Sequence, residues 1–466
     1  MSLLVRGGTV VNSQGRRAAD VLCEDGRIAA VLEPGSGVAA DEAVDAGGLL
    51  VFPGFIDPHV HPRDPGDTHK EDFAHASRAA AAGGITTLLV MPNAVPPVTD
   101  AASFRRRAEE HGAVAHVDFG LWGLSLGMAN IDDLAGLFAA GAVAVKLFWG
   151  YALDRESKRL VYNSDDCTPD DVIPPASTGE VLEICRVVAG AGGILGAHCE
   201  DRDILDVGQR RLGRAPEDYT ELNVARPEVA ESTSVAVGIE LSRATGCRFH
   251  VCHISSARAT HLVRLARKDG LPVTAETCPH YLLLAADDCA GKDSAMKAYP
   301  PCREPEDREA LWAGVIDGTI TSLGSDHAPH TLEDKTQPFA TAPAGMVAVE
   351  VMMPLLLDQM TAGRLTPERL CWAACEGTAR LYGLHPRKGA ILPGADADLV
   401  LVDPQATWTI RGEDLHSVQR HTPFEGYEVR GMPVMTILRG SVVAAGREPV
   451  GAPHGRLVRR EVRGRS

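Results

Sequence analysis

The sequence predicts an α/β protein in which a parallel sheet of βα units is flanked by a small β-sandwich. Apolar, strand-like runs alternate with Ala-rich helical stretches such as 72–83 (DFAHASRAAAAG) and 259–268 (ATHLVRLARK), and this alternation is typical of βα units. Residues 3–50 and 388–446 instead alternate apolar and polar residues around glycine-containing turns. That second pattern predicts short antiparallel strands at both ends of the chain.

The two end pieces are expected to form one discontinuous β-sandwich domain, over 1–50 and 386–450. A parallel α/β barrel is predicted for 51–385, because such a barrel occupies about 200 to more than 400 residues as one unit. Residues 451–466 are basic, with five arginines between Arg456 and Arg465. We expect this tail to be a solvated end or a contact between subunits.

Composition narrows the class of protein. A formal net charge of −16 argues against nucleic acid as a partner. Eleven cysteines at irregular spacing favour reduced thiols in a cytoplasmic protein over a disulfide framework. The first residues lack the pattern of a signal peptide, and no apolar run of 18 residues predicts a membrane span.

A His-x-His pair follows the apolar run 48–56 (GLLVFPGFI), which predicts a buried strand. His59 and His61 therefore point to the same side at the strand's end, because side chains i and i+2 share a face. Two imidazoles in this arrangement can hold one divalent metal ion. Two surface histidines beside a turn are the alternative.

Four more polar residues end apolar segments along the chain: Lys146, His198, His253 and Asp326. The carboxyl ends of parallel barrel strands form the edge where catalytic residues collect. Each residue also has a structural explanation, as an ion-pair partner, a core histidine or a helix N-cap. Their occurrence together, after His59 and His61, favours a two-metal site. The polar segment 152–177 is expected to be a long loop after the fourth strand, at the same edge, and either a lid or an inert insertion.

At this point the chain resembles the amidohydrolase superfamily, and within it the cyclic amidohydrolases: dihydroorotase, allantoinase, dihydropyrimidinase and hydantoinase. The resemblance covers nearly the whole chain. It is carried by DPHVHPRDPG, AAAAGGITTLLVMPN, VKLF, AHCED, HVCHISS, TAETCPHYL, GSDHAPHT and KGAILPGADADLVLVDP. It implies a (β/α)8 TIM barrel with a β-sandwich, hydrolysis of a cyclic amide, and a homodimer or homotetramer.

The resemblance also implies a ligand set for two divalent metal ions, with zinc as the expected metal. His59, His61 and Asp326 would hold one ion and His198 and His253 the other. Lys146, carboxylated by CO2, would bridge the two, since a carbamate offers one oxygen to each cation where a free ammonium would be repelled. Asp326 would also move a proton from the attacking water to the leaving nitrogen.

Three residues match the dihydroorotase pattern for binding a substrate carboxylate: Arg63, Asn93 and His330. A guanidinium, an amide and an imidazole are donors suited to a planar anion. The sequence therefore favours a dihydroorotase-like enzyme of pyrimidine metabolism that acts on a carboxylate-bearing ring. An ion pair of Arg63 with Asp64 or Asp67 is the structural alternative.

Two residues depart from that pattern. Tyr151 resembles the tyrosine of hydantoinases and dihydropyrimidinases that donates to the oxyanion, although it could also pack a lid. Tyr299 stands where dihydroorotases usually have an asparagine that reads the substrate ring. A hydantoinase, dihydropyrimidinase or allantoinase acting on another cyclic ureide is therefore the alternative. A non-catalytic scaffold relative is a third, which the complete ligand set disfavours.

Overall fold

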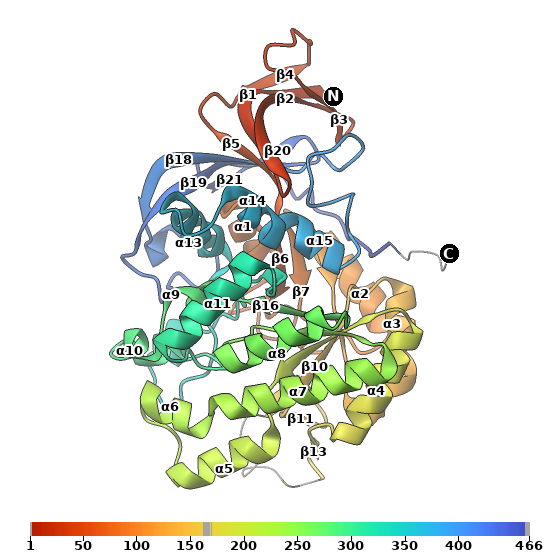
Figure 1. Ribbon diagram of the computed structural model, residues 1–466, viewed down its shortest axis with the longest axis vertical. Helices are drawn as coiled ribbons and strands as arrows, with labels where there is room; N and C mark the ends of the chain where they lie inside the picture. The colour runs from red at the N-terminus through yellow and green to blue at the C-terminus, as the bar shows by residue number, and fades with distance from the viewer. Residues whose placement is uncertain (1, 162–167, 169, 462–466) are drawn as a thin grey trace.

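The computed structural model describes residues 2–161, 168 and 170–461. Figure 1 shows a barrel surrounded by helices, with a β-sheet unit above it made of strands from the two ends of the chain. The predicted fold class, an α/β barrel with an additional β unit, is confirmed. No helix of the described residues has the length and apolar character needed to cross a membrane.

The barrel consists of parallel strands in eight positions. They run in the order β6 (Phe55–Val60), β7 (Ile85–Val90), β8 (Asp118–Leu121) with β9 (Gly123–Leu124), β10 (Val145–Trp149), β14 (Ile194–Cys199), β15 (Arg248–Val251), β16 (Val273–Thr277) and β17 (Ser322–Leu323). Only Trp122 separates β8 from β9. A parallel bridge between Val60 and His327, just beyond β17, brings the last strand back to the first.

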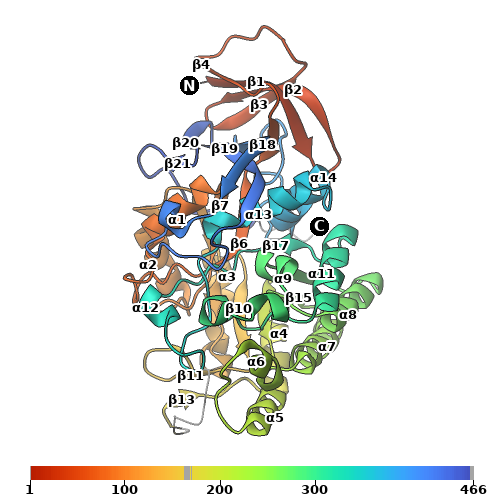
Figure 2. The same cartoon turned by 90° about the vertical axis from the view of Figure 1, so that its left-hand side faces the viewer.

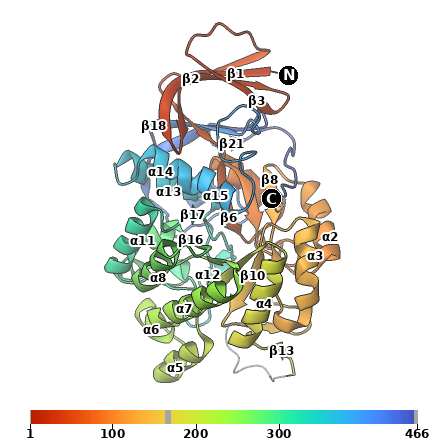
Figure 3. The same cartoon turned by 45° about the vertical axis from the view of Figure 1, so that its right-hand side comes forward.

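Helices cover the outside of the barrel, as Figures 2 and 3 show from two further sides. The covering helices are α1 (Phe73–Ala82), α2 (Ala101–Gly112), α3 (Leu134–Ala140), α4 (Thr178–Gly190), α7 (Glu228–Thr245), α8 (Ala257–Lys268) and α11 (Pro305–Asp317). The predicted helices 72–83 and 259–268 correspond to α1 and α8. Asp72 and Ser256 cap these two helices by accepting backbone N–H bonds.

Further helices lie in the loops and in the connection back to the second unit. They are α5 (Arg202–Leu212), α6 (Tyr219–Ala225), α9 (Pro279–Leu283), α10 (Ala286–Cys289), α12 (Leu332–Lys335), α13 (Val349–Thr361), α14 (Pro367–Cys371) and α15 (Gly377–Leu381). Helix α13 is buried along most of its length, and it packs against the outer sheet.

The outer unit joins both ends of the chain in one nine-stranded sheet with its own apolar core. Its strands are β1 (Ser2–Asn12), β2 (Gly15–Glu24), β3 (Arg27–Leu32), β4 (Glu42–Asp45), β5 (Leu50–Pro53), β18 (Leu399–Thr409), β19 (Glu428–Leu438), β20 (Ser441–Ala445) and β21 (Glu448–Pro449). The N-terminal and C-terminal parts meet where β5 pairs with β18. The prediction of antiparallel strands was wrong for β4, which pairs parallel with β1, whereas β5 pairs parallel with β1 and antiparallel with β18.

The apolar run 48–56 is not one strand, as the sequence predicts, but parts of two. Strand β5 belongs to the outer sheet and β6 to the barrel. Gly54 separates them, and a Cβ at this glycine would lie 2.0 Å from the Thr86 hydroxyl oxygen. The chain therefore passes from one unit to the other through a point that only glycine fits.

Two further expectations need correction. Within 152–177, β11 (Ala152–Asp154), β12 (Leu160–Val161) and β13 (Val172–Ile173) form a small antiparallel sheet. Its apolar side chains pack with the loop after β9, which the polar composition of the segment conceals. Residues 162–167 and 169 lie outside the described residues.

The basic tail is docked on this chain as far as Glu461. Arg456 and Val458 exchange backbone hydrogen bonds with Phe119 of β8, and Val458 is buried. Arg460 donates to the carbonyl oxygen of Gly192. The backbone of the described part of the tail is therefore docked on β8, while Arg456 and Arg459 remain exposed to solvent.

A buried ionic cluster joins the barrel to the outer unit. The Lys388 ammonium, 1% exposed, lies 2.5 Å from carboxylate oxygens of Asp118 and Asp398 and 3.0 Å from Asp396. Arg439 pairs with Asp118 from the other side. Asp118 begins barrel strand β8, whereas Asp396 and Asp398 precede β18, so one lysine links the two units.

Replacing Lys388 by methionine should destabilise the protein by about 3–5 kcal/mol, because it leaves buried carboxylates without their main counter-ion. The measurement is the midpoint and slope of urea unfolding. Lys268→Met, at an exposed lysine at the end of α8, is the matched control. Equal midpoints for the two variants would contradict a structural role for the cluster.

Candidate metal centre

The structure brings together all six residues that the sequence predicts as metal ligands. His59 lies in β6, Lys146 in β10 and His198 in β14. His61 directly follows β6, whereas His253 lies two residues beyond β15 and Asp326 three residues beyond β17. Because these strands are parallel, their carboxyl ends open on one mouth of the barrel.

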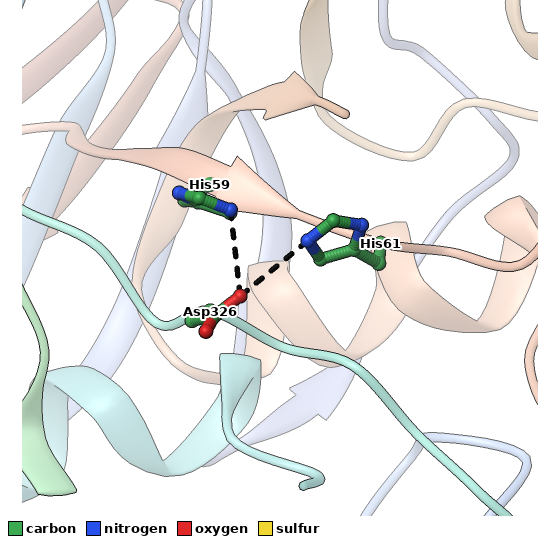
Figure 4. A group of neighbouring side chains, drawn as sticks. All are labelled: His59, His61 and Asp326. Atoms are coloured by element: carbon green, nitrogen blue, oxygen red, sulfur yellow. Dashed lines mark ion pairs between the residues drawn. The ribbon is translucent and has the colours of Figure 1, made fainter. Parts of the chain in front are cut away.

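Asp326 lies between the two histidines of the first strand. One of its carboxylate oxygens is 3.4 Å from Nε2 of His59 and 3.4 Å from Nε2 of His61. Figure 4 shows both imidazoles pointing at this carboxylate. These three residues offer ligand atoms close enough to share one ion.

The second histidine pair lies beside the first. Nδ1 of His198 is 3.2 Å from Nε2 of His253, and the rings of His59 and His253 have centroids 5.2 Å apart. Lys146 is fully buried, and its charge acts on all three of these histidines. Among the described residues its ammonium has no hydrogen-bond partner.

Acceptors behind the histidines fix which ring nitrogen faces the centre. Nδ1–H of His59 donates to Glu276, and Nδ1–H of His61 donates to Asn93 Oδ1 at 2.7 Å. Nε2–H of His198 donates to Glu200 at 2.7 Å. Such partners orient metal-binding imidazoles and raise their basicity. The roles of Glu200 and Glu276 were not predicted from the sequence, although Glu200 is two residues from His198 and so shares its side of the strand.

The charges of the site suit a cation. Burial raises the pKa of Asp326, but the neighbouring histidines hold it well below its usual value. Burial lowers the pKa of His61 to about 4 and that of His253 well below its usual range. Burial and Lys146 lower the pKa of His59, yet Glu276 and Asp326 carry it to about 10. The two carboxylates thus favour positive charge at His59. A proton on His59 supplies part of that charge here, and a divalent ion would supply it in place of the proton.

Three of the seven described non-glycine residues with positive φ belong to this site. Arg63, His253 and Asp326 have φ of 58°, 35° and 48°, in the left-handed region that non-glycine residues rarely adopt. Each such conformation costs roughly 1–3 kcal/mol and persists where the surrounding structure enforces it. Two of the three are predicted metal ligands, so the strained backbone conformation orients ligand side chains.

A pocket opens above these residues. The predicted residues Arg63, Asn93, Tyr151 and Tyr299 line it together with the histidines and Asp326. His330 does not line it, but lies behind Arg63, with Nε2 3.2 Å from the Arg63 guanidinium. Asn93 has a role that the sequence did not reveal, since its amide oxygen holds His61. Asp67 pairs with Arg159, whereas the Arg63 guanidinium donates to the carbonyl oxygen of Pro329.

The Tyr151 hydroxyl belongs to a buried ionic chain. It donates to Glu200 at 3.2 Å and accepts from Arg226. The Arg226 guanidinium also pairs with Glu200 and lies 4.0 Å from the centre of the Tyr299 ring. A Cβ at Gly150 (φ 101°) would lie 2.1 Å from the Glu200 carbonyl oxygen, so glycine permits this close approach. Arg226 was missed at the sequence level.

This arrangement is the one that the resemblance to cyclic amidohydrolases implies. Histidines lie on the first, fifth and sixth strands, a lysine on the fourth and an aspartate after the eighth. The model of the amidohydrolase family matches residues 50–443. The chain belongs to the amidohydrolase family.

Within the family, the chain is similar to several cyclic amidohydrolases over its whole length. An allantoinase of Rubrobacter xylanophilus is 40% identical, over 98% of this chain and 97% of the relative. A dihydroorotase of Bacillus anthracis is 33% identical, over 95% and 98%. The solved L-hydantoinase (dihydropyrimidinase) of Arthrobacter aurescens has a TM-score of 0.91 at 32% identity, over 98% and 99%. These enzymes are named after different cyclic substrates.

Replacing Lys146 by alanine should remove most bound divalent metal. The variant lacks the side chain that lies among His59, His198 and His253, which are three of the predicted metal ligands. Metal per chain, measured by elemental analysis, checks this expectation. Acetate or propionate should restore part of the metal by supplying a carboxylate in the vacated space.

Lys297→Ala is the matched control, since Lys297 is equally buried but donates to the Phe339 carbonyl oxygen at 2.6 Å. It should keep its metal. A Lys146→Ala protein with the full metal content of the wild type would contradict the assignment.

Proposed function

We propose that this protein is a binuclear metal hydrolase that opens a cyclic amide or ureide ring. The proposal is supported above all by Lys146, a fully buried ammonium facing three histidines without a hydrogen-bond partner among the described residues. An uncompensated buried charge is costly. Conversion to a carbamate would replace it with an anion suited to two cations.

The residues present fit the metal ions that the family implies. His59, His61 and Asp326 would hold one ion, His198 and His253 the other, and a carbamate on Lys146 both. Imidazole and carboxylate ligands suit zinc, and equally manganese, iron or cobalt. When bound, such a pair lowers the pKa of water and polarises the ring carbonyl group.

Asp326 is placed to move the proton of the reaction. Its low pKa keeps it a carboxylate, so its free oxygen can accept a proton from the attacking water. It then returns that proton to the ring nitrogen as the C–N bond breaks. Tyr151 lines the same pocket, and its hydroxyl hydrogen, donated to Glu200 in this structure, can turn to the developing oxyanion. Arg226 donates to the hydroxyl oxygen and holds it in position.

The positive side of the pocket supports a ring that carries a carboxylate. Arg63 lines the pocket, with Lys70 3.2 Å from the far nitrogen of His330 and Lys335 buried nearby. Burial and the surrounding cations keep His330 neutral by lowering its pKa far below the usual value. Among the described residues that line the pocket, Asp326 is the one carboxylate. A dihydroorotase-like substrate could place its carboxylate against the Arg63 guanidinium.

A neutral ureide such as allantoin is the second candidate. The 40% identity with an allantoinase supports it. Tyr299, stacked on Arg226, also replaces the amide that would read a dihydropyrimidine ring. Turnover of dihydroorotate, allantoin, hydantoin and dihydrouracil by the metal-loaded protein separates the candidates.

Asp326→Asn keeps an oxygen near the site but cannot accept a proton. We expect kcat to fall by about 10²–10⁴ on whichever ring the wild type opens. Steady-state kinetics with metal content measured on the same samples separate proton transfer from metal loss. Asp334→Asn, at the rim beside Lys70, is the control. A kcat near that of the wild type would remove Asp326 from this role.

The Arg63→Met variant tests whether the substrate ring carries a carboxylate that Arg63 binds. Losing a shielded charge pair costs roughly 2–5 kcal/mol, so kcat/KM should fall steeply for carboxylated rings and little for neutral ones. Arg159→Met, which removes an exposed arginine paired with Asp67, should affect neither class. Equal losses on both ring classes would make Arg63 structural and put the neutral ureide first.

A further inference from the structure

His280 is a buried side chain whose hydrogen-bonding groups the fold leaves unused. It lies in α9, directly after β16, and is 1% exposed. Neither Nδ1 nor Nε2 has a hydrogen-bond partner within the described part of the chain. No other described side chain has two buried polar atoms in that state.

This arrangement is costly for a structural residue. A buried polar group without a partner costs about 1–3 kcal/mol, and buried polar groups in proteins are nearly always bonded. His116 is a histidine of equal burial in the same barrel, and its Nε2 makes a 2.9 Å hydrogen bond with the Val443 carbonyl oxygen. The orphan nitrogens of His280 therefore indicate a partner that is not part of the chain.

The position of His280 indicates what that partner is. Its side chain lines the pocket that contains His59, Asp326 and Tyr299. Burial lowers the pKa of His280 to about 4, so the imidazole is neutral at neutral pH. A neutral imidazole offers one N–H donor and one acceptor nitrogen. That pair suits the N–H and C=O groups of a ureide ring better than it suits a carboxylate.

We propose that His280 contacts the substrate ring itself, by a hydrogen bond between its imidazole and an N–H or C=O group of the cyclic ureide. The inference rests on the proposed ring-opening function and adds a residue that recognises the ring. Arg63, by contrast, recognises a substituent. His280 then positions the scissile amide beside Asp326.

The test compares His280→Leu with His116→Leu in the metal-loaded protein. Removing two unsatisfied buried atoms should leave the Tm of His280→Leu unchanged or higher, with unchanged metal per chain. Its kcat/KM, on the ring that the wild type opens, should fall at least tenfold, mainly through KM. His280→Asn, which keeps a donor and an acceptor, should regain part of this loss. His116→Leu should lower the Tm and leave KM unchanged.

Each other result overturns the inference. A His280→Leu protein that loses Tm as His116→Leu does, with KM unchanged, makes His280 structural. Loss of metal makes it part of the metal centre. A wild type that opens none of the rings overturns the proposed function and this inference with it, and that outcome is recognised in the wild type before any variant is measured.

Discussion

The convergence of parallel strand ends on one mouth is the constraint on which the site depends. Eight strand positions in the described chain close into a barrel through the bridge from Val60 to His327. Residues far apart in sequence, such as His61 and Asp326, come within hydrogen-bonding range because of that closure. The interior of the barrel is itself polar below the mouth. His250 contacts Glu276 at 3.3 Å, and Glu276 in turn holds His59, so part of the core is organised around the orientation of one imidazole.

The fold class and the six candidate ligands could be predicted from the sequence because their signals are local. A polar residue at the end of an apolar run is visible in one dimension, and His59 and His61 need only the period of a strand. The resemblance to cyclic amidohydrolases is confirmed by the family match. The small sheet in 152–177 and the docking of the tail were missed, because short apolar pairs such as Leu153 and Leu160 carry no periodic signal.

The supporting residues could not be predicted, because their roles depend on what they face. Glu276 and Arg226 are ordinary charged residues in the sequence. Only folding shows that one orients His59 and the other joins Glu200 to Tyr151. For Asn93 and His330, the sequence predicts the residue but not its contact. Their positions in the motifs are as expected, but Asn93 bonds to His61 and His330 lies behind Arg63. A motif therefore identifies the residue more securely than the contact it makes.

The pairing of β5 with β18 has a consequence for how the chain acquires its structure. Strand β5 is synthesised long before residues 399–402, with which it pairs, since the whole barrel is encoded in between. Contacts of such high sequence separation form slowly, and until then β5 presents an unpaired edge, which is prone to aggregation. Part of the outer unit is therefore made before the barrel and completed after it, and Lys388 can bind Asp118 and Asp398 only once residues 388–398 have been made.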